Sequence, residues 1–216
     1  MTLHAPVPDY AAARRAMVDS QLKPQGVTDA GVLAAMGRVP RERFVPAEVQ
    51  PIAYIDRALP LGHGRFLSAC SVHGQLLTQI APQAGEKALV VGAGTGYAAA
   101  LLADIGLQVT ALEQEADLLA IGQAESVAIV QGDLEAGYPA TGPYDVILID
   151  GAVDYIPDAI TDQLAPGGRL GTALSERGVT RLIVGRKAGG AFGYLSINDA
   201  GVPALPGFRR HHSFTF

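Results

Sequence analysis

The sequence predicts an α/β protein with a doubly wound, mostly parallel sheet and an N-terminal helical extension. Three observations carry this prediction. Short apolar, strand-like runs alternate with helical segments between residues 87 and 173. A glycine-rich turn directly follows the first of these runs. Two strand-like segments joined by Lys187-Ala-Gly-Gly190 end the pattern, and they predict two antiparallel strands at the close of the sheet.

The first 80 residues are predicted to form helices and loops packed on the core. Asp9 is a suitable N-cap for a helix over 8–22, and Thr28 or Asp29 for a second helix that ends at Pro40. Prolines and glycines across 41–70 predict loops with short helical pieces. A third helix is expected over 71–80. We therefore expect an N-terminal subdomain over 1–80 and an α/β core over 81–216.

The core is predicted to alternate strands and helices in one functional domain of ordinary size. The sequence has 216 residues, and 49% of them are hydrophobic, which is enough for a sizeable core. The expected strands are 87–91, 108–112, 127–130, 145–149, 168–173, 180–185 and 191–197, and the expected helices are 96–105, 114–122 and 157–164.

Composition excludes several function classes. The formal net charge is −5, and the one basic cluster, Arg209-Arg-His-His212, is short, so no nucleic-acid surface is expected. The single Cys70 excludes an internal disulfide and fits a reducing compartment. The start of the chain lacks the pattern of a signal peptide, and the apolar run 88–103 is short and broken by glycines. We expect a cytoplasmic protein that binds neither nucleic acid nor a membrane.

The glycine turn is the first candidate ligand site. Its spacing, G-x-G-x-G, is one residue tighter than the G-x-G-x-x-G of dinucleotide-binding folds. The tighter form is usual in class I (Rossmann-like) methyltransferases, where this loop holds the amino-acid end of S-adenosylmethionine. The alternative is a glycine-rich turn without a ligand. The candidate cofactor-binding residues of the loop are Gly92, Ala93, Gly94, Thr95, Gly96 and Tyr97.

Acidic residues follow three of the other predicted strands. Glu113 is placed to accept both ribose hydroxyls of an adenosyl group, or else to pair with a helix dipole. The third strand is followed by Gly132, Asp133 and Leu134. In methyltransferases an acidic residue at this place commonly accepts a hydrogen bond from the adenine amino group, and the next apolar residue packs on the adenine ring. A plain turn is the alternative there. Asp150 lies at the carboxyl edge of the sheet, beside the site, or only caps the next segment.

Several stretches resemble the protein-L-isoaspartate O-methyltransferase family. The resemblance covers roughly residues 10–185, and its N-terminal run is specific because generic methyltransferases lack it. The stretches are Arg15–Lys23 followed by Gly26–Asp29, Val39–Pro46, Ala58–Gly62, Pro143–Asp145, Ile156-Pro157 and Asp162–Leu170. The resemblance implies a carboxyl O-methyltransferase that uses S-adenosylmethionine, releases S-adenosyl-L-homocysteine and acts on isoaspartyl residues of damaged proteins.

The same resemblance implies an active-site segment. Gly64-Arg-Phe-Leu-Ser68 aligns with the family's Gly-x-Thr-Ile-Ser, so Ser68 falls on the active-site serine. His73 matches a histidine that lies against the cofactor in the animal-type version. Leu67, Ser68 and His73 are therefore added to the cofactor-binding candidates, with Ser68 also the catalytic candidate. Taken alone, Ser68 is equally a helix cap and His73 a packing residue.

Departures from the family pattern bear on the methyl acceptor. Phe66 replaces the family threonine and Cys70 its proline, both where the substrate carboxyl is expected to approach. The link from Glu113 to Gly132 is shorter than usual, and the tail 207–216 matches nothing in the family. The alternatives are a same-fold methyltransferase with another acceptor, or a cofactor-binding protein with little or no turnover. The oligomeric state is left open.

The implied chemistry needs few reactive groups. A substrate carboxyl has a pKa of about 4 and is already ionised at neutral pH, so no general base is required. Ser68 is then expected to position the acceptor and not to act as a nucleophile. No metal is expected, because His63 and His73 have no clustered partners. Glu113→Ala is expected to weaken cofactor binding with little effect on folding.

Overall fold

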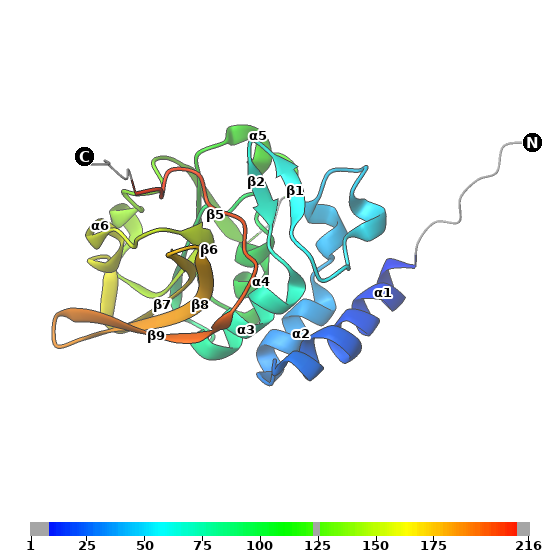
Figure 1. The fold of residues 1–216 in the computed structure, drawn as a ribbon, viewed down its shortest axis with the longest axis horizontal. Helices are drawn as coiled ribbons and strands as arrows, with labels where there is room; N and C mark the ends of the chain where they lie inside the picture. Colours follow the sequence, from blue (N-terminus) through cyan, green and yellow to red (C-terminus); the bar gives the residue numbers. More distant parts are fainter. Residues whose placement is uncertain (1–8, 123–125, 211–216) are drawn as a thin grey trace, which may run out of the picture.

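The computed structural model describes residues 9–122 and 126–210, and its elements follow the predicted order (Figure 1). The helices are α1 (Tyr10–Met17), α2 (Ala30–Arg38), α3 (Cys70–Ile80), α4 (Tyr97–Ile105), α5 (Ala116–Leu119) and α6 (Asp158–Thr161), with shorter turns at Val18–Leu22, Lys23–Gln25, Arg41–Phe44, Gln50–Ile52 and Pro139–Thr141. The strands are β1 (Leu59–Gly62), β2 (Arg65–Leu67), β3 (Lys87–Val91), β4 (Gln108–Glu113), β5 (Val127–Gln131), β6 (Tyr144–Val153), β7 (Leu164–Glu176), β8 (Val179–Ala188) and β9 (Ala191–Asp199).

The main sheet has seven strands in the order β5-β4-β3-β6-β7-β8-β9. The first five are parallel to one another, whereas β8 is antiparallel to both of its neighbours. This confirms the doubly wound, mostly parallel sheet and its antiparallel ending. The chain leaves β3 towards β4 and later returns to the other side of β3 as β6. The carboxyl ends of β3 and β6 therefore flank a topological switch point, where open α/β sheets bind ligands.

Residues of β3 alternate between two hydrophobic cores, one on each face of the sheet. Ala88 and Val90 belong to the core that also contains the buried Met17 and Met36, whereas Leu89 belongs to the core on the other face. Because Met17 and Met36 lie in the first 80 residues, the N-terminal helices share a core with the sheet. The boundary at residue 80 stays a prediction.

The N-terminal predictions are confirmed in most details. The Asp9 carboxylate accepts the Ala12 N–H at 2.9 Å, and Asp29, not Thr28, caps the second helix by accepting the Val32 N–H at 2.9 Å. The segment 41–70 also contains an antiparallel hairpin of β1 and β2 that the sequence analysis missed. Strands of four and three residues are too short to show a periodic pattern, which explains the omission.

Two predicted helices are much shorter than expected, and the strands β6, β7, β8 and β9 are longer. The segment 114–122 contains only α5, and 157–164 contains only α6 before β7 begins at Leu164. The alternative role of Ser68 as a helix cap is wrong. Ala69 occupies the N-cap of α3 without a side-chain hydrogen bond, and Asp56 accepts the Ser71 N–H at 2.9 Å.

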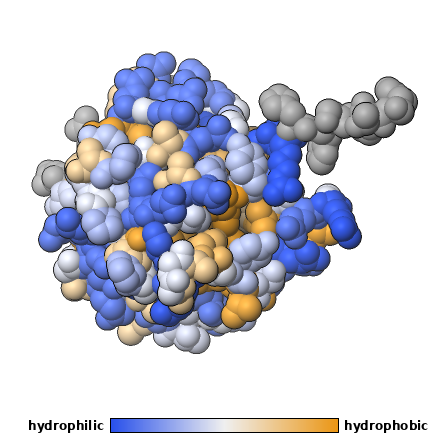
Figure 2. Space-filling model, turned by 90° about the vertical axis from the view of Figure 1, so that its left-hand side faces the viewer, coloured by the Kyte–Doolittle hydropathy of each residue, from blue (hydrophilic) through white to orange (hydrophobic). Residues whose placement is uncertain are grey.

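Three further findings concern membranes, the surface and metals. Over the described residues, no helix is long and apolar enough to cross a membrane. The face shown in Figure 2 is mostly hydrophilic, with separate apolar patches between the polar side chains. Within residues 9–122 and 126–210, no group of three or more metal-ligating side chains is found.

Candidate active site

The glycine loop joins the carboxyl end of β3 to α4, as the sequence predicts. Gly92, Gly94 and Gly96 have φ values of 71°, 57° and 92°, a region that residues with a Cβ rarely adopt. A Cβ on Gly92 would lie 2.9 Å from a Leu205 methyl carbon and 3.0 Å from Arg65 Nη2. The loop therefore needs glycine both for its backbone conformation and for close approach of other groups.

The side chains of the loop pack into the interior of the protein. Ala93, Thr95 and Tyr97 are all buried. Thr95 donates its hydroxyl to the Phe44 carbonyl at 2.6 Å, and the Tyr97 ring packs edge-on against His73 with centroids 5.6 Å apart. Burial raises the pKa of Tyr97 far above its ordinary value. The loop therefore offers a cofactor mainly its backbone.

Glu113 lies beside this loop at the end of β4, and it is 0% exposed. Its carboxylate oxygens accept two contacts from Arg65 Nη1, at 2.7 and 2.8 Å. They also accept the N–H of Gly94 at 2.6 Å, of Gln114 at 2.8 Å and of Glu115 at 3.2 Å. Glu113 thus holds together the loop, the start of the α5 segment and the β1–β2 hairpin. Its role with a ribose stays a prediction, and the structure adds a structural role.

Arg65, a residue that the sequence analysis did not select, faces the glycine loop. In β2 the side chains of Arg65 and Leu67 are buried, whereas Phe66, between them, is 39% exposed. Strand geometry places neighbouring side chains on opposite faces. The wall towards the glycine loop is therefore made by Arg65, and Phe66 lies on the solvent side. No sequence pattern signals this burial, because a strand of three residues is too short to show an alternation.

Ser68, His73 and Asp150 form one buried hydrogen-bonded cluster. The Asp150 carboxylate accepts the Ser68 hydroxyl at 3.1 Å and lies 2.9 Å from His73 Nε2. Burial would raise the pKa of Asp150, but the charge and hydrogen bond of His73 and the hydroxyl of Ser68 together lower it below its ordinary value. The structure thus brings together three residues that the sequence selected separately, and Asp150 lies beside the site. The only base that the Ser68 hydroxyl contacts among the described residues is the Asp150 carboxylate, which is weak because its pKa is lowered. Ser68 is therefore poorly activated as a nucleophile, which fits a positioning role.

Arg41 is a second residue that sequence reasoning missed. It is 0% exposed and donates to the carbonyls of Ala53, at 2.8 Å, and Ser68, at 2.7 Å. Its guanidinium carbon lies 4.9 Å from the centroid of the Tyr97 ring, within cation–π range. Arg41 therefore connects the Ser68 segment to the start of α4. An arginine in a short polar stretch gives no sequence signal of such burial.

The segment after β5 lies next to Glu113 and forms a turn. Gly132 donates its N–H to the Glu113 carbonyl at 3.1 Å. Asp133 is exposed, and its carboxylate accepts the Glu135 N–H at 3.0 Å, as in a plain turn. Leu134 is buried in the hydrophobic core. The adenine-binding role of Gly132, Asp133 and Leu134 stays a prediction, and the contact of Asp133 also fits the turn alternative.

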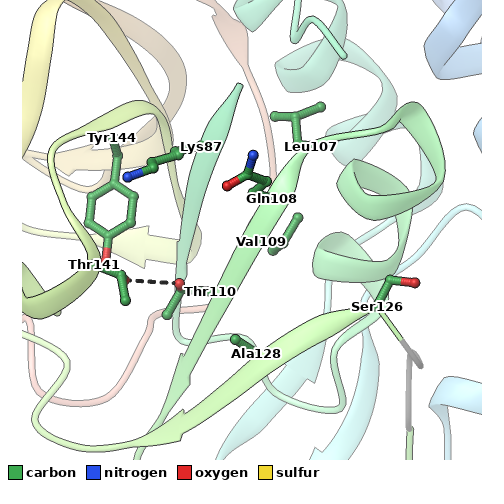
Figure 3. Close-up of a pocket in the computed structure, with 9 residues that line it drawn as sticks. All are labelled: Lys87, Leu107, Gln108, Val109, Thr110, Ser126, Ala128, Thr141 and Tyr144. Atoms are coloured by element: carbon green, nitrogen blue, oxygen red, sulfur yellow. Dashed lines mark hydrogen bonds between the residues drawn. The ribbon is translucent and has the colours of Figure 1, made fainter. Parts of the chain in front are cut away.

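A separate hollow of 480 Å³ lies at the other end of the strands (Figure 3). Lys87 and Gln108, which line it, begin β3 and β4, and the Thr110 and Thr141 hydroxyls hydrogen-bond across it at 3.1 Å. The glycine loop follows the opposite, carboxyl end of β3. The hollow in Figure 3 is therefore distinct from the candidate active site.

The carboxyl edge fits an adenosyl-sulfonium cofactor. Three glycines permit close approach to the loop backbone, which Arg65 and Leu205 make at Gly92 in this structure. The Glu113 carboxylate lies within hydrogen-bond distance of the Gly94 N–H. His73 Nδ1 is buried and has no hydrogen-bond partner within residues 9–122 and 126–210, so it is a polar atom that a ligand could contact. This loop, the acidic residue at the end of the neighbouring strand and the antiparallel end of the sheet define a class I methyltransferase.

Comparison with known proteins gives the family. The family model described as Protein-L-isoaspartate(D-aspartate) O-methyltransferase (PCMT) matches residues 12–194. A protein-L-isoaspartate O-methyltransferase of Methylorubrum extorquens (strain PA1) is 43% identical over 175 residues, which are 78% of this chain and 77% of the relative. The Koribacter versatilis (strain Ellin345) enzyme of that name is 37% identical over 199 residues, 88% of this chain and 89% of the relative. The chain belongs to the protein-L-isoaspartate O-methyltransferase family and is an S-adenosylmethionine-dependent methyltransferase.

Solved structures agree on the fold. A protein-L-isoaspartate O-methyltransferase superimposes with a TM-score of 0.78 at 23% identity, over 92% of this chain and 66% of that one. A Plasmodium falciparum structure in complex with S-adenosyl-L-homocysteine has a TM-score of 0.77 at 22% identity, over 89% of this chain and 97% of that one.

Proposed function

We propose that this chain transfers a methyl group from S-adenosylmethionine to the free carboxylate of L-isoaspartyl residues in damaged proteins, a repair reaction. The observation that carries the proposal is the Ser68–Asp150–His73 cluster. It holds the family's active-site segment at the carboxyl edge of the sheet, next to the helix that begins at Tyr97. We propose the cytoplasm as the compartment, because Cys70 is a free, buried thiol.

The reaction requires the chain to bind and align two molecules, the cofactor and the substrate. When bound, the cofactor supplies an electrophilic methyl group. The Gly92–Gly96 backbone, Glu113 and Asp133 would hold it. A substrate carboxylate only accepts hydrogen bonds, so Ser68 orients it by turning its hydroxyl from Asp150 to the substrate. Asp150 and His73 then keep the Ser68 segment in place. Alignment and exclusion of water, without a general base, account for the rate.

The proposal predicts label transfer to an isoaspartyl peptide. With radiolabelled S-adenosylmethionine, the purified chain should methylate a peptide containing isoaspartate and leave its aspartyl twin unlabelled. The twin is the matched control, since it differs only in the linkage of one residue. Absence of label in both peptides, with cofactor binding demonstrated by calorimetry, would show that isoaspartate is not the acceptor.

Ser68→Ala is expected to lower kcat by about 2- to 13-fold, the effect of losing one hydrogen bond worth about 0.5–1.5 kcal/mol. Cofactor affinity should change less, because Ser68 is proposed to orient the acceptor. Ser71→Ala is the matched control, since its hydroxyl donates to Asp56 at 2.8 Å, on the adjacent segment. Equal losses in kcat and cofactor affinity would assign Ser68 to the cofactor instead.

One observation favours a different acceptor as the second candidate. Phe66 replaces a threonine of the family pattern and presents an exposed ring on the outer side of β2. Because this ring lies on the solvent side and not towards the glycine loop, where the sequence analysis expected it, it would contact residues that flank the reacting carboxylate and not the carboxylate itself. It therefore favours an acceptor with apolar neighbours. A panel of carboxylate-bearing peptides with apolar neighbours, compared in the same labelling assay, separates this candidate from the first.

A further inference from the structure

The guanidinium of Arg65 lies in the cradle that the cofactor needs. Arg65 is 4% exposed, and its Nη1 contacts both Glu113 carboxylate oxygens. Its Nη2 donates to the Gly92 carbonyl at 2.6 Å. The carboxylate proposed to bind a ribose therefore already accepts hydrogen bonds from a cation of the same chain. A buried, charge-assisted contact of this kind is among the strong hydrogen bonds of proteins.

Leu205 covers the same loop from the C-terminal side. Its methyl carbons lie 2.9 and 3.0 Å from the position of a Cβ on Gly92, and its own Cβ lies 2.9 Å from that position on Gly151. The segment around it is fixed to β6, because Leu205 donates its N–H to the Ala152 carbonyl at 2.7 Å and Ala152 donates to the Pro203 carbonyl at 2.9 Å. Arg65 and Leu205 thus meet over Gly92.

We propose that Arg65 and Leu205 form an internal plug, which competes with S-adenosylmethionine for the glycine loop and Glu113. This inference rests on the cofactor of the proposed function and concerns what controls its binding. The cofactor binds only to molecules in which Arg65 has left Glu113. The apparent dissociation constant then equals the intrinsic one divided by the fraction of open molecules.

The hairpin that carries Arg65 lies outside the seven-stranded sheet, although Leu59, Leu61 and Leu67 anchor it in the hydrophobic core. β1 and β2 form a two-stranded sheet of their own, so opening breaks no hydrogen bond of the seven-stranded ladder. Its tip contains His63, which lies 3.5 Å from Glu115 and 3.8 Å from Asp117 with all three side chains well exposed. Exposed polar contacts of this kind contribute little stability, so they offer little resistance to opening.

The test is calorimetric titration with S-adenosyl-L-homocysteine. Arg65→Met retains the apolar stem and removes the cation, and it is expected to tighten binding by at least about tenfold, because one charge-assisted contact no longer has to be broken. Arg169→Met is the matched control. Arg169 also contacts both oxygens of a carboxylate, Glu86, at 2.7 and 2.9 Å, but lies away from the loop, and affinity should be unchanged.

Leu205→Ala tests the second half of the plug and keeps the inference testable if Arg65→Met does not fold. It should tighten binding several-fold, while Leu174→Ala, a buried leucine of the same core, should not. If the native chain binds and neither plug variant binds more tightly, the plug is refuted and the proposed function stands. Weaker binding by Arg65→Met would make Arg65 a cofactor ligand and also refute the plug. If no form binds the ligand, both proposals fail.

Discussion

Glu113→Ala is expected to destabilise the folded chain by about 3–5 kcal/mol, the usual cost of removing one partner of a buried ion pair. The remaining Arg65 would keep its charge at a site that is 4% exposed, without a carboxylate. Three backbone N–H groups would also lose their acceptor. Urea unfolding at neutral pH measures the effect. This outcome replaces the sequence-based expectation that folding would hardly change.

A double variant provides the control for this prediction. Glu113→Ala combined with Arg65→Met removes both charges, so much of the lost stability should return, because an apolar pair can replace a buried ion pair at little cost. The coupling between the two positions is then read from a double-mutant cycle. If Glu113→Ala costs less than about 1 kcal/mol, or if the second change restores nothing, the Arg65 contact does not stabilise the fold.

The second large effect concerns Asp150 and acid. The folded pKa of Asp150 is depressed below 3.8, because the His73 and Ser68 contacts outweigh burial. A depressed carboxyl pKa stabilises the fold above the unfolded value, and this stability is lost as pH falls through the folded value. Asp150→Asn should therefore lower the free energy of unfolding by about 1.5–3 kcal/mol at pH 7, which is the contribution of hydrogen bonds to a charged group. The loss should be smaller below pH 3.8.

Unfolding free energies measured from pH 7 down to pH 2 check this prediction. Asp199→Asn is the matched control: its side chain is 72% exposed and pairs with Arg181 at the surface, so its curve should follow that of the native chain. A constant gap between native and Asp150→Asn chains at every pH would mean that Asp150 acts through packing and not through its charge.

The features that depend on local pattern could be predicted from the order of the amino acids. Alternating strand-like runs and helices predicted the strands β3 to β9 along the chain. The G-x-G-x-G spacing located the loop after β3. Glu113 and Asp150 were found because residues at the ends of parallel strands meet at one edge of a sheet. Family stretches placed Ser68 and His73. Each of these inferences needed only neighbouring residues.

The contacts of these residues, in contrast, depend on how distant segments of the chain pack together. Arg65 meets Glu113 across 48 positions of sequence, Arg41 meets the Ser68 carbonyl across 27, and Ser68 meets Asp150 across 82. Such pairs leave no periodic or motif signal, because their partners are chosen by how the hairpin and the N-terminal segment pack over the sheet edge. The plug over the glycine loop therefore depends on tertiary packing. It requires burial of Arg65, which the local sequence presents as an ordinary surface cation.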